Sequence, residues 1–148
     1  MQENIRLFTM EIMKLHGTNK RLYELVCSLV MNPVILRQNN NYPFKTDARY
    51  VWYVATEGEQ TIGFIPIKMI DNYNYLIDNY YVKGDDTSLL KSLLKEIIKD
   101  QTNETELWAT VHKRHVELFI QNGFCTHLQW KNYDKMKYCS KKNVVCTD

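Results

Sequence analysis

The sequence has the size and composition of one ordinary folded domain. It has 148 residues, of which 45% are hydrophobic and 24% are charged, and its formal net charge is +2 at pH 7. These values exclude a chain that is disordered by composition, and the charge is too small to indicate nucleic-acid binding. We find no apolar stretch of membrane-spanning length and no signal-peptide pattern. The four cysteines show no CxxC spacing, so we expect reduced thiols in a cytoplasmic protein.

Hydrophobic periodicity, interrupted by proline and glycine, divides the chain into strands and helices. In order, these are a strand (4–11), a helix opened by Thr18 or Asn19, a short helix (34–37), a loop (38–46), strands at 50–56, 61–70 and 75–82, a helix that begins within 85–88 and reaches 99, a strand (106–111), a short helix (115–122) and one or two strands within 124–138. The three consecutive middle strands predict an antiparallel meander. Pro66 cannot donate to a strand ladder, so an edge or a bulge is expected there. We expect one α+β domain.

The strand, turn and helix over residues 75–99 give the first candidate site. The turn residues 85–88 are Asp-Asp-Thr-Ser, all of which suit a helix start, where backbone N–H groups need an acceptor. A strand that runs through a tight turn into a helix directs these N–H groups beyond the end of the strand. Anions favour that position. The sequence therefore indicates a possible anion site at this turn.

The order of these elements resembles that of the GNAT family of acyl-CoA N-acyltransferases over residues 5–138. The most specific part is VHKRHVELFIQNGF at 111–124, which is similar to the family's penultimate strand and last helix. The family usually has an aliphatic residue, Asn, and later a Tyr four positions before a Gly-Phe pair. Here Gly123–Phe124 is in place, Phe119 stands at the Tyr position and His112 at the Asn position.

The resemblance implies a GNAT-like N-acetyltransferase domain over residues 1–138, followed by a loose tail at 139–148. In such a domain a mixed, mostly antiparallel sheet is flanked by helices, and acetyl-CoA lies as co-substrate in a groove between strands that splay at Val82 and Val111. The implied cofactor-binding residues are Tyr80, Val82, Lys83, Thr87, Ser88, Leu89, His112 and Phe119. The implied acceptor is an amine on a small molecule or a protein. We expect no metal, nucleic acid or membrane partner, and a homodimer is compatible with the resemblance.

The turn after Val82 departs from the family's pattern. The family commonly has Arg/Gln-x-x-Gly-x-Gly/Ala there, whereas this chain has KGDDTSLLKS with a single glycine. A helix N-terminus favours an anion by about 0.3–1 kcal/mol, and two unit charges ~4 Å apart interact by about 1 kcal/mol in water. Asp85 or Asp86 would cancel the helix contribution if it pointed into the groove, and would occupy the N–H groups if it capped the helix. Lys83 would offset part of the repulsion.

Two functions therefore remain open. One is N-acetyl transfer from acetyl-CoA to an amine by direct transfer. The other is a non-catalytic GNAT-like binding domain with a lapsed CoA site, which the Asp-Asp-Thr-Ser turn and Phe119 favour. Whether acetyl-CoA binds the protein separates the two.

Direct transfer needs a group that deprotonates the amine and a proton for the leaving thiolate. Asp78 is the only carboxylate inside the central strand, and is the candidate base; its alternative role is that of a bulge residue that accepts backbone hydrogen bonds. Phe119 cannot supply the proton that the family's Tyr supplies. Tyr81 is a candidate substitute, as are Tyr80 and Tyr133, and each can instead be a packing residue.

Two further groups of residues indicate binding sites only weakly. His112, His115, Cys125 and His127 are of the types that bind zinc. The intervening helix would separate the two pairs by about 10 Å at 1.5 Å per residue, so no metal site is expected. The lysines near the C-terminus suit a solvated face better than a nucleic-acid surface; they are Lys131, Lys135, Lys137, Lys141 and Lys142.

Overall fold

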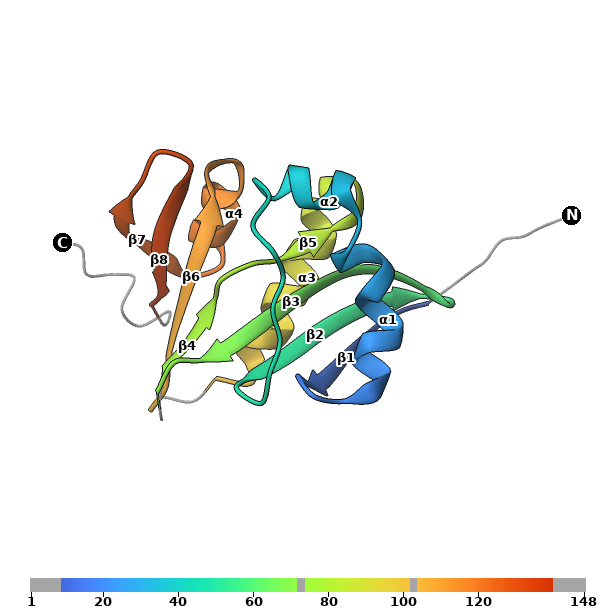
Figure 1. Ribbon diagram of the computed structural model, residues 1–148. Coiled ribbons are helices and arrows are strands. Elements are labelled where there is room, and N and C mark those ends of the chain that lie inside the picture. Colours follow the sequence, from blue (N-terminus) through green and yellow to red (C-terminus); the bar gives the residue numbers. More distant parts are fainter. Residues whose placement is uncertain (1–8, 72–73, 102–103, 140–148) are drawn as a thin grey trace, which may run out of the picture.

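The computed structural model describes residues 9–71, 74–101 and 104–139, which form one sheet with helices on both faces (Figure 1). The strands are β1 (Met10–His16), β2 (Tyr50–Glu57), β3 (Gln60–Met69), β4 (Asn74–Ile77), β5 (Tyr81–Val82), β6 (Glu106–His112), β7 (Phe124–Gln129) and β8 (Tyr133–Tyr138). The helices are α1 (Lys20–Val30), α2 (Pro33–Gln38), α3 (Thr87–Lys99) and α4 (Val116–Gln121), with 3₁₀ turns at Lys83–Asp85 and Lys113–His115. The predicted α+β domain is confirmed.

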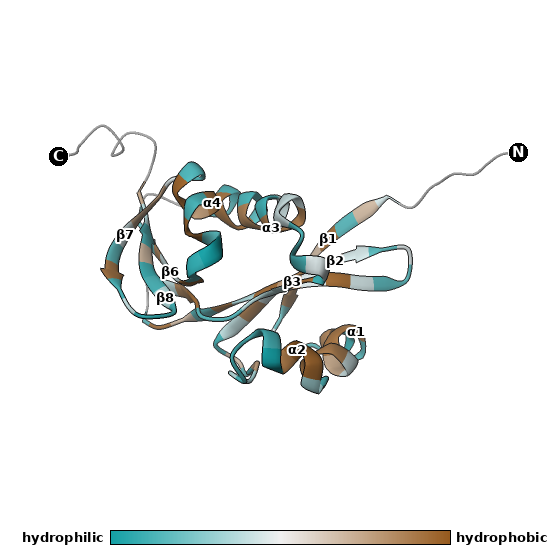
Figure 2. Cartoon of the chain, turned by 90° about the horizontal axis from the view of Figure 1, so that it is seen from above, coloured by the Kyte–Doolittle hydropathy of each residue, from teal (hydrophilic) through white to brown (hydrophobic). Residues whose placement is uncertain are grey.

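The helices cover the two faces of the sheet in pairs. Figure 2 shows α1 and α2 on one face and α3 and α4 on the other. Helix α3 turns its leucines and isoleucines onto the sheet, and Leu90, Leu93 and Ile97 have no exposed surface. On the opposite face, Leu22 and Val26 of α1 pack in a second cluster that includes Trp52. The four-residue apolar repeat of α3 therefore forms the larger core, as its periodicity predicts.

The strand order places one parallel pair in an otherwise antiparallel sheet. The order is β1-β2-β3-β4-β6-β8-β7, and β5 pairs with β3 off this path. β4 and β6 run parallel from Asn74↔Glu106 to Ile77↔Ala109. Beyond this point β6 continues beside β8 alone, whereas the chain after β4 continues as β5 beside β3. The two parallel strands therefore separate and open the sheet between them, where the sequence predicts a groove.

A bulge separates β4 from β5. On β3, Ile67 pairs with Ile77 and Phe64 pairs with Tyr81, so the two residues between them lie opposite the three residues 78–80. The extra residue breaks the ladder and re-aims the side chains on either side of it. Pro66 lies opposite this interruption, as expected of a residue without a backbone N–H. The predicted strand at 75–82 is consequently two short strands.

The first strand lies later than the sequence predicts. β1 covers Met10–His16 and pairs with β2 along its whole length. The predicted strand at 4–11 falls largely outside the described residues, as does the predicted tail at 139–148 except for Cys139. The loose alternation before Met10 is a weaker determinant than the long ladder that β2 offers. The helix that follows is capped by Asn19, whose Oδ1 accepts a hydrogen bond from the Arg21 N–H at 2.8 Å.

Among the described residues no helix has the length and apolar character needed to cross a membrane. The helices are instead amphipathic, and the turn residues between them are polar. This distribution places the large apolar side chains between the sheet and the helices.

The fully buried leucines of α3 should dominate the stability of the fold. Replacing Leu93 by Ala removes a side chain with no exposed surface and leaves a cavity beneath the sheet. We expect a loss of about 2–5 kcal/mol in the free energy of unfolding, measured by urea denaturation. The exposed Lys95 on the same helix is the control, and Lys95→Ala should change stability by less than about 0.5 kcal/mol. Equal effects of the two substitutions would contradict this packing.

Candidate functional site

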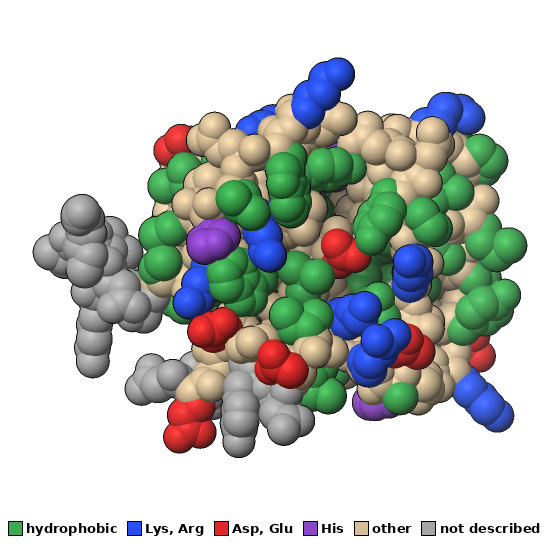
Figure 3. All heavy atoms as spheres, turned by 60° about the vertical axis from the view of Figure 1, so that its left-hand side comes forward, with side chains coloured by type: hydrophobic (Ala, Val, Ile, Leu, Met, Phe, Trp, Pro, Cys, Tyr) green, Lys and Arg blue, Asp and Glu red, His purple; other side chains and the backbone are tan. Residues whose placement is uncertain are grey.

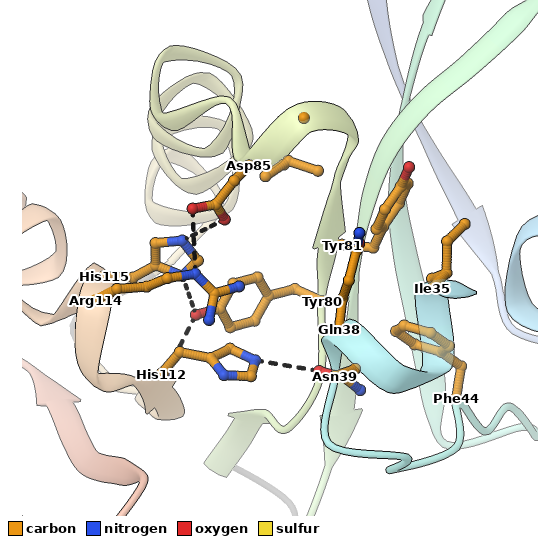
Figure 4. Close-up of a pocket in the computed structure, with 12 residues that line it drawn as sticks. Ile35, Gln38, Asn39, Phe44, Tyr80, Tyr81, Asp85, His112, Arg114 and His115 are labelled. Carbon is orange, nitrogen blue, oxygen red and sulfur yellow. Dashed lines mark hydrogen bonds and ion pairs between the residues drawn. The ribbon is translucent and has the colours of Figure 1, made fainter. Parts of the chain in front are cut away.

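The separated strands enclose a cleft of about 330 Å³. It is bounded by α2 and the loop after it, by β5 with its following turn, and by the turn between β6 and α4 (Figure 4). The lining residues are Ile35, Gln38, Asn39, Phe44, Tyr80, Tyr81, Val82, Gly84, Asp85, His112, Arg114 and His115. The groove implied between Val82 and Val111 therefore exists as a cavity.

Tyr80 crosses this cleft from one wall to the other. It follows the bulge, and its ring lies between the strands with only 4% of its surface exposed. Its hydroxyl lies 2.7 Å from Nδ1 of His115 and accepts a hydrogen bond from the His112 backbone N–H at 3.3 Å. Burial raises the pKa of Tyr80 above its ordinary value, so the hydroxyl stays protonated. The Tyr80 hydroxyl therefore donates a hydrogen bond to Nδ1 of His115.

His115 links the Tyr80 hydroxyl to Asp85, which lies in the turn after β5. Its Nε2 lies 2.8 Å from Asp85 Oδ1, and Arg114 Nε donates to Asp85 Oδ2 at 3.1 Å. Burial lowers the pKa of His115 despite the opposing effect of Asp85, so the ring is neutral at pH 7 and carries its proton on Nε2. Burial raises the pKa of Asp85, but hydrogen bonds from Arg114 and His115 outweigh it and leave the pKa below its usual value. Tyr80, His115 and Asp85 thus form a hydrogen-bonded chain across the cleft.

The N-terminus of α3 is capped from within the chain. Asp86 Oδ1 accepts hydrogen bonds from the N–H groups of Ser88 at 3.0 Å and Leu89 at 3.1 Å. Of the two alternatives for the turn, capping therefore holds for Asp86, whereas Asp85 faces the opposite wall. The N–H groups of Gly84 and Thr87 have no acceptor within the part of the chain that the structure describes. These two donors stay available to an anion beside Lys83.

A second cavity, of about 410 Å³, lies on the other side of Tyr80 and His112. Asn39, Tyr80 and His112 line both cavities and form the wall between them. Burial is the main cause that lowers the pKa of His112 to about 4, so its ring is neutral at pH 7. Its Nε2 lies 3.1 Å from Asn39 Oδ1, and the Asn39 amide also bonds to Asn79. Hydrogen bonds of His112 to Asn39 and to Tyr80 therefore link the three residues of the dividing wall.

The candidate catalytic residues lie on different sides of this wall. Asp78 lines the second cavity, and its Oδ2 accepts a hydrogen bond from the Tyr42 hydroxyl at 2.8 Å. Tyr81 lines the first cavity, and its ring packs against Phe64 with the ring centres 5.6 Å apart. Tyr133 lines the second cavity, where it accepts a hydrogen bond from Asn40. Asp78 and Tyr133 therefore lie on one side of the wall, and Tyr81 lies on the other.

The candidate cofactor-binding residues also separate into groups. Tyr80, Val82 and His112 line the cleft. Thr87, Ser88 and Leu89 form the first turn of α3, where Leu89 is buried. Phe119 is completely buried and packs against Phe124 with the ring centres 5.1 Å apart, so its side chain is part of the core and does not line the cleft. Lys83 is exposed beside the cleft and is not among its lining residues.

Sequence reasoning missed the contacts of His115, Arg114 and Asp85. His115 was considered only as a zinc ligand, and Arg114 was not considered. The signal in the sequence was weak. Arg114 and His115 precede the last helix, and Asp85 and Asp86 lie in the turn after β5. Polar residues in either place can simply face solvent. Within the described ranges no group of three or more His, Cys, Asp or Glu residues could hold a metal ion.

The lysines of β8 are engaged with an aromatic ring. Lys135 and Lys137 place their Nζ atoms 5.0 and 5.3 Å from the ring centre of Trp108, and His127 packs edge-on against the same ring. Figure 3 shows the side of the molecule on which β7 and β8 lie, where basic, acidic and hydrophobic side chains are interspersed. On this face, the visible charges do not form one continuous basic surface.

The fold matches those of solved acyltransferases. No protein-family model matches the sequence, and no curated protein is significantly similar to it in sequence. An acyl-CoA N-acyltransferase from Pseudomonas aeruginosa is similar in structure, with TM-score 0.67, 12% identity, and coverage of 88% of this chain and 100% of that one. The Campylobacter jejuni N-acetyltransferase PseH in complex with acetyl coenzyme A gives TM-score 0.59, 19% identity, and coverage of 90% and 100%.

A GNAT family acetyltransferase from Elizabethkingia anophelis with acetyl-CoA bound gives TM-score 0.58, 15% identity, and coverage of 87% of this chain and 97% of that one. These similarities extend over nearly the whole of each solved chain. They show that this chain has the GNAT acyltransferase fold, as its order of elements indicates.

The neutral side chains of His112 and His115 should make stability depend on pH. The folded pKa of His112 is lowered from 6.5 to about 4, so between these values the unfolded chain binds a proton that the folded protein does not. Stability should therefore fall as the pH is lowered, and the shift of His115 acts in the same direction. The lowered pKa of Asp85 contributes stability that is fully present above the ordinary value of 3.8 and is lost only below it, so Asp85 does not add to a change between pH 7 and pH 5.

The measurement is the urea midpoint of unfolding at about pH 7 and about pH 5. His112→Gln should show a smaller decrease between the two than the unsubstituted protein. His127→Gln, which replaces an exposed histidine, is the control and should keep the full decrease. If His112→Gln shows the same decrease in the urea midpoint as the unsubstituted protein, the lowered pKa of His112 is not its cause.

Proposed function

We propose that this GNAT-fold chain is an acetyl-CoA-dependent N-acetyltransferase that transfers the acetyl group directly to an amine. The observation that carries the proposal is the separation of the parallel strands β4 and β6 beyond Ile77 and Ala109. It leaves a cavity between the strands, with a second cavity behind the same wall. Direct transfer needs two such adjoining sites, one for the donor and one for the acceptor.

The turn after β5 offers donors for the phosphates of acetyl-CoA. Gly84 and Thr87 provide N–H groups without an acceptor among the described residues, and Lys83 adds a cation. Backbone N–H groups at such a turn are a common way to hold phosphate. Arg114 on the opposite wall becomes available if Asp85 leaves it. The residues therefore fit a diphosphate once Asp85 gives way.

Asp78 and Tyr80 suit the two proton transfers of the reaction. The amine nitrogen forms a bond to the acetyl carbon, the carbon–sulfur bond breaks, one proton leaves the amine, and the thiolate takes up another. Asp78 faces the second cavity as an acceptor for the amine proton. Tyr80 is a better placed thiolate acid than Tyr81, because its protonated hydroxyl lies inside the cleft; to protonate the thiolate, the hydroxyl would turn its proton away from Nδ1 of His115.

The rival function is a binding domain without catalysis. The Asp86 cap on Ser88 and Leu89, together with the ion pair of Asp85 with Arg114, favours this rival, since both use groups that a phosphate would otherwise contact. The Tyr80 ring also fills part of the gap between the strands. Both functions share the fold, so they differ in whether acetyl-CoA binds.

Acetyl-CoA should stabilise the protein and bind more tightly when Asp85 is neutral. At 100 times its dissociation constant a ligand adds about 2.7 kcal/mol, which a thermal unfolding curve detects. Asp85→Asn keeps a residue that tolerates the positive φ of 54° at this position and removes the negative charge that pairs with Arg114 across the cleft. We expect the dissociation constant for acetyl-CoA to fall by about fivefold, equivalent to ~1 kcal/mol.

The control is Glu59→Gln, which removes one negative charge in the exposed turn between β2 and β3. It should leave the dissociation constant unchanged. If millimolar acetyl-CoA shifts the unfolding temperature of neither the unsubstituted protein nor Asp85→Asn, acetyl-CoA does not bind. The function is then that of a binding domain without catalysis.

Asp78→Asn should slow acetyl transfer without preventing acetyl-CoA binding. A positioned base contributes about 10²–10⁴ to a rate, so the turnover number should fall by that factor. The measurement follows release of free thiol with a panel of amines, and the thermal shift with acetyl-CoA serves as the internal control. Turnover equal to that of the unsubstituted protein would exclude Asp78 as the base.

A further inference from the structure

The second cavity combines aromatic walls with a carboxylate. Its volume of about 410 Å³ is that of a pocket for a small organic molecule. The lining residues are Asn39, Asn40, Tyr42, Asp78, Asn79, Tyr80, Thr110, His112, Trp130 and Tyr133. They come from the loop after α2, the bulge, the end of β6 and the β7–β8 hairpin. Four segments far apart in the sequence therefore converge on one site.

The carboxylate of Asp78 sets the charge of this cavity. No lysine or arginine is among its lining residues, and His112 is neutral at pH 7. The hydrogen bond to Asp78, aided by burial, raises the pKa of Tyr42 to about 12, so Tyr42 stays a neutral donor. Lys45 lies over the Tyr42 ring at 5.9 Å, outside the lining. A ligand in the cavity therefore meets one negative charge among neutral polar groups.

Aromatic rings stand around this charge. Trp130 at the tip of the β7–β8 hairpin is 47% exposed although it lines the cavity, and Tyr42 is 39% exposed. The loop that carries Tyr42 is held in place, since Asn40 donates to the Tyr133 hydroxyl at 2.7 Å and Asn39 donates to the Tyr42 carbonyl at 2.9 Å. Aromatic faces attract cations, and their apolar surface suits an apolar body.

We propose that this cavity binds a small monocationic amine with an apolar body, whose ammonium group lies near Asp78 and whose body packs against Trp130 and Tyr133. That this amine is also the acetyl acceptor rests on the proposed function. The cavity shares the wall of Asn39, Tyr80 and His112 with the cleft, so a bound ammonium lies next to the donor site. Neutral and anionic molecules of the same shape lack the attraction to Asp78.

The direct test compares two probes of nearly the same shape and different charge. Binding of 2-phenylethylamine, as its hydrochloride, and of 2-phenylethanol is measured by calorimetry on the full chain without acetyl-CoA. The amine should bind about tenfold more tightly, a difference of ~1.4 kcal/mol. Equal binding of the two probes, or no binding of the amine, overturns the proposal.

Substitutions locate the binding. Asp78→Asn should remove the preference for the amine and leave the affinity for 2-phenylethanol unchanged, while Trp130→Ala should weaken both probes. Glu59→Gln, in an exposed turn outside the cavity, should leave both affinities as they are. A preference that survives Asp78→Asn overturns the assignment. Tighter binding of a short peptide with one lysine and blocked ends overturns the restriction to small amines.

The outcome is independent of acetyl-CoA. If the amine binds as expected and acetyl-CoA does not, the proposed enzyme fails and the amine site stands. If acetyl-CoA binds and the charge preference is absent, the amine site fails and the enzyme stands. The two proposals are thus separated by two binding measurements on the same protein.

Discussion

The bulge at residues 78–80 determines where the chemical groups of this molecule lie. Strand side chains alternate between the two faces of a sheet, so one extra residue changes which way the following side chains point. Here it lets Tyr80 enter the gap between the strands and leaves Asp78 in the neighbouring cavity. Because β3 pairs with β4 before the bulge and with β5 after it, the bulge is also where β4 parts from β6.

The acids of the turn after β5 decide how open the cleft is to an anion. Asp86 uses its carboxylate as a helix cap, which satisfies two N–H groups of α3. Asp85 instead spans the cleft to Arg114 and His115. The first contact is local and stabilises the helix start, and the second joins two walls that a ligand would have to separate. A ligand with negative charge can compete with the second contact and leave the first in place.

Local patterns in the sequence predicted most of the fold. The apolar repeat of α3 is strong enough to place the helix, because it depends on neighbouring residues. Pro66 indicated an edge or a bulge, and the bulge lies opposite it at residues 78–80. The start of β1 was missed because it is fixed by pairing with β2, some forty residues away. The site was predicted only in part. The groove follows from the element order, whereas the contact of His115 with Asp85 joins residues 30 positions apart and depends on side-chain packing that no spacing records.

The account's central claim is that the cleft between β5 and β6 receives acetyl-CoA. Amide resonances of the ¹⁵N-labelled protein, followed during titration with acetyl-CoA, test it directly. We predict saturable changes confined to residues 80–89 and 112–115, with the Gly84 and Thr87 amides among them because they lack an acceptor among the described residues. Unchanged resonances in both segments at millimolar acetyl-CoA would contradict the claim.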